Sequence, residues 1–196
     1  MKRITLLAIS SFVLLTVMAQ SAIYPEGLKV GDKAPAIVGK DNHGNNFDLN
    51  KQLDKGDVVV IFYRGHWCPF CNKQLGQLND SLAMITAKGA SVVAISPETM
   101  ENVVKTVEKS KADFPIISDE SMAIMKAYKV GFVVDDKTQE RYKKFGLDFS
   151  VVNGSNGANL PVPATYIIDK NGMIKYAFFN PDYKKRTSVK DILEHL

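Results

Sequence analysis

One stretch decides the fold of this chain, and it reads Val58-Val59-Val60-Ile61-Phe62-Tyr63-Arg64-Gly65-His66-Trp67-Cys68-Pro69-Phe70-Cys71. Its first part is a continuous apolar run, which is typical of a buried strand. The residues that follow place apolar side chains at roughly helical spacing, namely Leu75, Leu78, Leu82 and Ile85. This spacing predicts a helix from about residue 70 to residue 88, which Gly89 ends in a left-handed conformation. The cysteines therefore fall at a strand-to-helix junction, where the helix N-terminus lowers the pKa of a thiol.

The spacing of Cys68 and Cys71 fits a structural disulfide, a metal site or a redox pair. A disulfide across two residues closes a short loop and stabilises little. Zinc needs two further ligands, and the sequence holds no second CxxC and no HxxxH. Residue 72 is Asn rather than His, which excludes covalent haem attachment through CxxCH. We therefore interpret the pair as a redox centre and predict no metal and no cofactor.

The first residues have the layout of a secretory signal peptide. Lys2 and Arg3 precede an apolar stretch from Ile4 to Val17, and small and polar residues follow it. A membrane anchor is the alternative, but the stretch is short for crossing a bilayer. We predict a signal peptide over residues 1–22, export to the periplasm or outside the cell, and no stable membrane insertion after its removal. Disulfides persist in such an oxidising compartment.

The remaining residues, 23–196, are long enough for a single domain with a substantial core. The composition is that of an ordinary globular protein, with 45% hydrophobic and 23% charged residues. The net charge is +4, but positive and negative residues are interspersed. Because the sequence shows no basic stripe and no nucleic-acid-binding motif, we expect no nucleic acid partner.

Strand and helix patterns alternate along this domain and predict an α/β fold. The expected strands cover residues 58–63, 91–96, 114–118, 161–169 and 173–179. The expected helices cover residues 70–88, 97–110, 121–128 and a final segment capped by Thr187 or Ser188. In the helix over residues 97–110, the side chains expected to face inward are Met100, Val103, Val104 and Val107. The alternation of strands and helices predicts a mixed, mostly parallel sheet flanked by helices, in which residues 173–179 return as an antiparallel strand. A hairpin extension around the turn at residues 41–45 precedes the sheet. Residues 131–160 break the pattern, and we interpret them as an insertion whose loop could cover a site.

The stretch from Val59 to Cys71 resembles the thioredoxin superfamily, and within it the peroxiredoxin-like branch of the alkyl-hydroperoxide reductase/thiol-specific antioxidant (redoxin) family. A second run is similar to the family's other landmark, Val162-Pro163-Ala164-Thr165-Tyr166-Ile167-Ile168-Asp169-Lys170-Asn171-Gly172. The resemblance covers about residues 28–195. It implies a thioredoxin-like fold in which a cis Val162–Pro163 bond lies beside the cysteines. From the residues alone, Pro163 fits a trans proline on an edge strand equally well.

The sequence departs from the peroxidase pattern of that family at two positions. A peroxidatic cysteine would align with Cys71, its threonine with Cys68 and its arginine with Pro163. Arg64 is a further cation, but nothing in the sequence brings its guanidinium to Cys71. The departures favour thiol–disulfide exchange, in which Cys68 is the more exposed, lower-pKa nucleophile and Cys71 resolves the mixed disulfide. Peroxide reduction through Cys71, and a binding module with a structural CxxC disulfide, remain as alternatives.

The same reasoning predicts a substrate site and partners. Trp67, Val162 and Pro163 are expected to form an apolar groove for a substrate strand, although a packing role fits Trp67 equally well. His66 stabilises a thiolate if it is protonated, but a single histidine is more often a surface or packing residue. The expected partners are a disulfide-containing protein or small thiol substrate and a dithiol electron donor.

Overall fold

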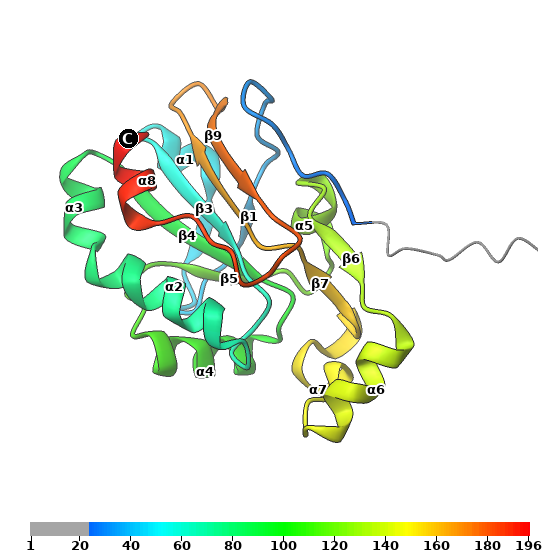
Figure 1. Ribbon diagram of the computed structural model, residues 1–196. Helices are drawn as coiled ribbons and strands as arrows, with labels where there is room; N and C mark the ends of the chain where they lie inside the picture. The colour runs from blue at the N-terminus through cyan, green and yellow to red at the C-terminus, as the bar shows by residue number, and fades with distance from the viewer. Residues whose placement is uncertain (1–23) are drawn as a thin grey trace, which may run out of the picture.

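A computed structural model describes residues 24–196 of the chain, in which helices cover both faces of a central sheet (Figure 1). The predicted signal peptide over residues 1–22 lies outside the described residues. The strands are β1 (Val38–Lys40), β2 (Asn46–Asp48), β3 (Val58–Phe62), β4 (Ser91–Ser96), β5 (Ile116–Ser118), β6 (Gly131–Val133), β7 (Asn159–Pro161), β8 (Ala164–Ile168) and β9 (Ile174–Phe179). The helices are α1 (Leu49–Leu53), α2 (Pro69–Asp80), α3 (Leu82–Ala87), α4 (Met100–Ser110), α5 (Ala123–Ala127), α6 (Asp136–Lys144), α7 (Phe149–Val152), the 3-10 helix η1 (Gly154–Asn156) and α8 (Val189–Glu194).

The central sheet has five strands in the order β5-β4-β3-β8-β9. β3 pairs in parallel with β4, and β4 with β5, whereas β8 pairs antiparallel with both β3 and β9. The α/β class and the mixed sheet of the prediction are confirmed, but half of the strand pairs are parallel rather than most. The reason is that β8 and β9 form a tight hairpin beside β3, so the last strands need no crossover helix.

The two faces of β3 supply the two main clusters of the core. Val58, Val60 and Phe62 pack on one face with residues of α1, α5 and the N-terminal hairpin. Val59 and Ile61 pack on the other face with Cys71 and the buried residues of α2, α3, α4 and α8. Alternate side chains of a strand point to opposite faces, so a strand buried on both sides is apolar throughout. The cysteines consequently belong to the α2 side of the molecule.

The predicted helix over residues 70–88 is divided into α2 and α3 at Ser81. Gly89 follows with a φ of +79°, as predicted for the end of this segment. The next helix begins at Met100 rather than at residue 97, and Val104, which was expected to face inward, is 47% exposed. The buried residues of α4 are Val103 and three polar residues, Asn102, Thr106 and Ser110. Asn102 donates to the Val152 carbonyl at 3.1 Å and Thr106 donates to Glu98 at 3.2 Å, so these buried polar groups have partners.

The insertion over residues 131–160 forms a subdomain of its own beside the main sheet (Figure 1). β6 and β7 pair antiparallel at its base, and α6, α7 and η1 lie between them. A small core fills it, consisting of Val134, Phe149, Val152 and Leu160, with Trp67 packed against the cluster. The insertion therefore contacts the segment that carries the cysteines.

The expected cis bond before Pro163 is absent, because no cis peptide bond occurs among residues 24–196. The Val162 amide donates to the Val130 carbonyl at 2.8 Å, and Ala164 already pairs with Phe62 in β8. The chain passes from β7 to β8 in an extended path, which a trans bond accommodates and which an X–Pro bond prefers by about 0.5–1 kcal/mol. This part of the prediction was wrong.

Within the described part of the chain, no helix has both the length and the apolar character needed to cross a membrane.

Candidate active site

The two cysteines lie at the N-terminus of α2, directly after β3 and a short loop. Cys68 is the N-cap, Pro69 is the first helical residue, and Cys71 is the third. Proline fits the first turn because its missing N–H would have no helical acceptor there. The amides of Cys71 and Asn72 both donate to the Cys68 carbonyl at 3.1 Å. Both sulfurs therefore experience the positive end of the helix dipole.

Both cysteines are free thiols and both are buried, with 1% of Cys68 and 0% of Cys71 exposed. Burial opposes ionisation of Cys71, but three other groups outweigh it and lower its pKa to about 6. They are the Cys68 thiol that donates to it, the charge of Arg186 and the amide of Arg64. The hydrogen bond to Cys71, and burial after it, raise the pKa of Cys68. Cys71 is therefore the thiolate of the pair.

This result corrects the expectation that Cys68 is the more exposed sulfur with the lower pKa. The helix N-terminus stabilises negative charge on either sulfur, so it does not choose between them. The choice comes from Arg186, whose Nη2 donates to Cys71 Sγ at 3.4 Å. Only one of the two thiols can hold the charge, because the second ionisation would set two anions side by side.

Arg186 comes from the segment between β9 and α8, far from the cysteines in sequence. Its Nη1 donates to the Lys185 carbonyl at 2.9 Å. The next residue, Thr187, is buried and shares a hydrogen bond of 2.7 Å with the Tyr176 hydroxyl of β9. Sequence reasoning missed Arg186 because no motif surrounds it, and a separation of 115 positions hides its contact with Cys71.

Arg64 is buried beside the cysteines but does not supply the guanidinium that contacts Cys71. Its side chain lies over the rings of Trp67 at 4.7 Å and Tyr183 at 4.3 Å. Its Nη2 donates to the Tyr142 hydroxyl at 2.8 Å. Cation–π contacts with these partly buried rings help to hold the guanidinium in place. Arg64 therefore joins the cysteine loop, the insertion and the segment after β9.

A second polar cluster anchors the loop before Cys68. Glu98 is fully buried and accepts from the His66 amide at 2.8 Å and the Thr106 hydroxyl at 3.2 Å, and its Oε1 lies 2.5 Å from His66 Nδ1. The His66 carbonyl in turn accepts from Asn72 Nδ2 at 2.8 Å. These contacts fix the orientation of the His66 ring and tie the loop to α2. Glu98 was not singled out from the sequence, because a lone glutamate after a strand carries no recognisable pattern.

The structure does not assemble Trp67, Val162 and Pro163 into a single groove. Trp67 packs edge-on against Tyr142 and Phe149 of the insertion, at ring-centroid distances of 5.3 and 5.7 Å. Val162 and Pro163 instead line a pocket together with Arg64. Arg64 contacts Trp67 on one side and faces this pocket on the other, so it separates the two parts of the predicted groove.

Residues 24–196 contain no group of three or more His, Cys, Asp and Glu side chains arranged to hold a metal ion. The chemistry available at the site is that of a buried thiolate, a neighbouring thiol and a guanidinium.

Comparison with known proteins places this geometry among thiol-based redox proteins. The AhpC/TSA family matches residues 30–177. Peroxiredoxin Q of Sedum lineare chloroplasts is 30% identical over 76% of this chain and 68% of that protein. The thiol-disulfide oxidoreductase ResA of Geobacillus thermodenitrificans is 25% identical over 100% of this chain and 92% of that protein. Among solved structures, the fold is similar to that of peroxidoxin BcpB from Mycobacterium tuberculosis, with a TM-score of 0.65, 20% identity, and coverage of 86% of this chain and 96% of that one.

Proposed function

Because this chain belongs to the AhpC/TSA family and is an oxidoreductase, we propose that it is a thiol-dependent peroxidase in which Cys71 attacks a small hydroperoxide and Cys68 resolves the product. The observation that carries this proposal is the contact of Arg186 with Cys71 Sγ at 3.4 Å. A guanidinium beside a thiolate stabilises the attacking sulfur and the negative charge that develops on the peroxide oxygens. Burial of both sulfurs also favours a small oxidant over a protein disulfide.

The first step is attack of the Cys71 thiolate on the outer oxygen of the hydroperoxide. An S–O bond forms and the O–O bond breaks, so sulfur gives up two electrons and becomes a sulfenic acid. The leaving alkoxide takes up a proton and departs as an alcohol, or as water when the substrate is hydrogen peroxide. Arg186 is the cation beside the reacting atoms, because its Nη2 already donates to the sulfur that attacks the peroxide.

Resolution then uses Cys68, which is the N-cap of α2 and lies three residues before Cys71. The Cys68 sulfur loses its proton and attacks Cys71, so an S–S bond forms while the S–O bond breaks and water leaves. An external dithiol returns two electrons and two protons to complete the cycle. Because the sulfur with the lower pKa is the better leaving group, the reductant attacks Cys68 and releases Cys71 as the thiolate.

The test is consumption of hydrogen peroxide with a dithiol as reductant, in the wild type and in single cysteine variants. Cys71→Ser is expected to abolish consumption. Cys68→Ser, oxidised in the absence of the dithiol, is expected to consume one equivalent in a single turnover and to leave a sulfenic acid at Cys71, which dimedone labels. Continued turnover by Cys71→Ser, or dimedone labelling of Cys68 in the wild type, would contradict the assignment.

Thiol–disulfide exchange with a disulfide substrate is the second candidate, as the sequence itself favoured. Its support is the presence of proline at position 163, where the resemblance implies an arginine in peroxidases, and the relatives named as thiol-disulfide oxidoreductases. It predicts that the pair equilibrates with glutathione, that insulin disulfides are reduced, and that Cys68→Ser abolishes this reduction. Peroxide turnover without any insulin reduction would reject it.

A further inference from the structure

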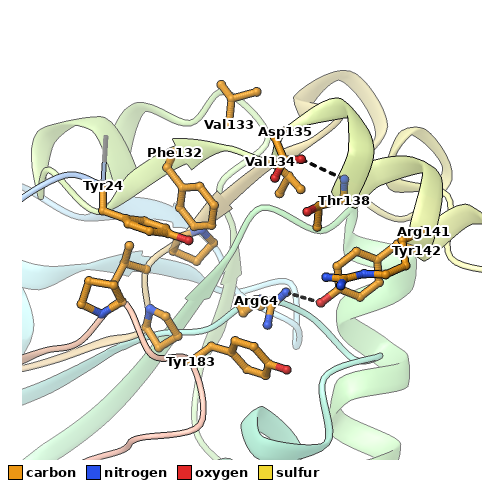
Figure 2. Close-up of a pocket in the computed structure, with 14 residues that line it drawn as sticks. Tyr24, Arg64, Phe132, Val133, Val134, Asp135, Thr138, Arg141, Tyr142 and Tyr183 are labelled. Carbon is orange, nitrogen blue, oxygen red and sulfur yellow. Dashed lines mark hydrogen bonds between the residues drawn. The ribbon is translucent and has the colours of Figure 1, made fainter. Parts of the chain in front are cut away.

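A pocket that is lined by Arg64 but not by Trp67 lies between the insertion and the segment after β9. Figure 2 shows Tyr142 and Tyr183 on either side of Arg64, with Tyr24 and Phe132 forming another wall of the pocket. Val162 and Pro163 add apolar surface, and the cavity measures about 170 Å³. Pockets that hold drug-sized ligands measure about 300–1,000 Å³, so this smaller pocket fits a smaller molecule.

Arg64 brings an unpaired positive charge to this pocket. It is 6% exposed, and within residues 24–196 no Asp or Glu side chain forms an ion pair with it. Its hydrogen bond to the Tyr142 hydroxyl uses one of its N–H donors, and its Nε is buried without an acceptor. A guanidinium has five such donors, and buried charges are normally paired. The charge of Arg64 acts on the Cys68 thiol, but no carboxylate in the described part of the chain pairs with it, so its pocket side lacks an anion.

The other charged groups of the pocket do not supply that anion. Asp135 lines the rim, but its side chain caps α6 by accepting from the Thr138 amide at 2.9 Å, as the dashed line in Figure 2 shows. Arg141 adds a second, exposed guanidinium to the lining. The charged residues of the lining are Arg64, Arg141 and Asp135, so its net charge is +1. Arg64 is the buried one of the three.

We propose that this pocket binds a small organic carboxylate with an apolar body, and that the carboxylate belongs to a redox substrate of Cys71 and Cys68. The planar fork of Arg64 matches a carboxylate, and the aromatic and proline walls match an apolar body. Most of the remaining lining is aromatic, aliphatic or proline surface, which favours a carboxylate with an apolar body over a phosphate. Neither cysteine lines the pocket, but the backbone amide of Arg64 donates to Cys71, so the residue that would hold the carboxylate also contacts the reacting sulfur. The second half of this inference rests on the proposed function, and the binding itself does not.

The binding test uses phenylacetate as the probe and phenylacetamide as its neutral analogue, titrated into the reduced full protein by calorimetry or NMR. Wild type is expected to bind phenylacetate about tenfold or more tightly than the amide, since a charge-assisted hydrogen bond contributes on that order. Arg64→Gln is expected to remove this preference, and Arg64→Lys to restore part of it. Lys144→Gln, which removes an exposed positive charge from the same insertion, is the matched control and should bind like the wild type.

Equal affinity for the acid and the amide in the wild type would overturn the carboxylate site without any variant, so a folding defect of Arg64→Gln cannot obscure the answer. An equal loss of affinity in Arg64→Gln and Lys144→Gln would also overturn the carboxylate site, because the loss would then reflect the overall charge of the protein rather than contact with Arg64.

The source of the carboxylate is tested by steady-state kinetics. One arm compares a carboxylate-bearing hydroperoxide with its methyl ester, and the other compares a mercaptocarboxylate reductant with its amide. A lower KM for the acid that is lost in Arg64→Gln assigns the pocket to the oxidant in the first arm and to the reductant in the second. Equal KM values in both arms would overturn the assignment to a redox substrate. Absence of turnover would contradict the proposed function alone, since phenylacetate binding is measured without any redox chemistry.

Discussion

At the scale of single residues, one contact between distant parts of the chain decides which of the two thiols ionises first. The CxxC spacing identifies two candidate thiols, but the guanidinium of Arg186 contacts only Cys71. That charge, together with the thiol of Cys68, lowers the pKa of Cys71 to about 6 despite complete burial. The thiol with the lowered pKa, and hence the nucleophile that we propose, is the cysteine inside the helix rather than the one at its cap.

The pH dependence of thiol alkylation tests this conclusion. The thiolate is the reactive form, so the rate of Cys71 alkylation by iodoacetamide should be near its plateau above a pH of about 7. It should fall with a midpoint near 6 as the pH is lowered. Arg186→Gln removes a stabilising charge and raises the pKa of Cys71, so its midpoint should move to higher pH. A rise of one unit reduces the thiolate fraction about tenfold on the acidic side of both midpoints.

Lys184→Gln is the matched control for this measurement, because it removes an exposed charge two positions from Arg186. Its midpoint should equal that of the wild type. A midpoint of Arg186→Gln that stays near 6 would show that the helix N-terminus and Cys68 suffice to hold the thiolate.

At the scale of elements, the site needs two helix N-termini that are far apart in the sequence. α2 orients the cysteines, and α8 begins three residues after Arg186. α8 starts with a capping box in which Ser188 and Asp191 satisfy each other's backbone amides. This cap defines where the segment that carries Arg186 ends.

Removal of that cap should cost stability. Ser188→Ala is expected to lower the free energy of unfolding by about 1 kcal/mol, the usual contribution of an N-cap hydroxyl. Urea denaturation followed by circular dichroism measures the change. Ser81→Ala is the control, because Ser81 is the N-cap of α3 but its side chain makes no capping hydrogen bond. Equal losses in the two variants would mean that the capping box of α8 does not contribute.

At the scale of the whole molecule, the insertion completes the wall around the site. Tyr142 and Phe149 pack edge-on against Trp67, and Tyr142 also accepts the hydrogen bond of Arg64. Phe149 is 4% exposed, whereas Phe145 of the same insertion is 85% exposed. The insertion is therefore joined to the cysteine loop through the aromatic contacts of Tyr142 and Phe149 with Trp67.

The single tryptophan of the chain reports on this contact. Phe149→Ala is expected to cost about 3 kcal/mol of stability, as for other buried phenylalanines, and to shift the emission of Trp67 to longer wavelength as water reaches the ring. Phe145→Ala is the control, and it should change neither quantity. An unshifted emission spectrum of Phe149→Ala would mean that the insertion does not shield Trp67.

Much of this fold was predictable because its signals are local. The run from Val58 to Phe62 is apolar at every position because both faces of β3 are buried. Gly89 has the positive φ expected of a residue that ends a helical segment. The hairpin of β1 and β2 and the capped start of α8 follow from turn and cap residues in the same way.

Other features escaped prediction because they depend on which segments meet in space. The break at Ser81 and the exposure of Val104 reflect how α2, α3 and α4 pack, and the periodicity of a single helix does not contain that information. The trans bond before Pro163 follows from the path between β7 and β8. The division of the predicted groove by Arg64 depends on Tyr142 of the insertion and on Tyr183, both of which lie far from Arg64 in the sequence.

The sequence by itself determined that two thiols stand at the start of a helix after a buried strand, because hydrophobic periodicity and residue spacing are properties of neighbouring positions. Only the tertiary structure decided which thiol carries the charge and what surrounds it. Arg186 and Arg64 act through distances of a few ångströms, and electrostatic stabilisation in a buried site depends on those distances rather than on order along the chain.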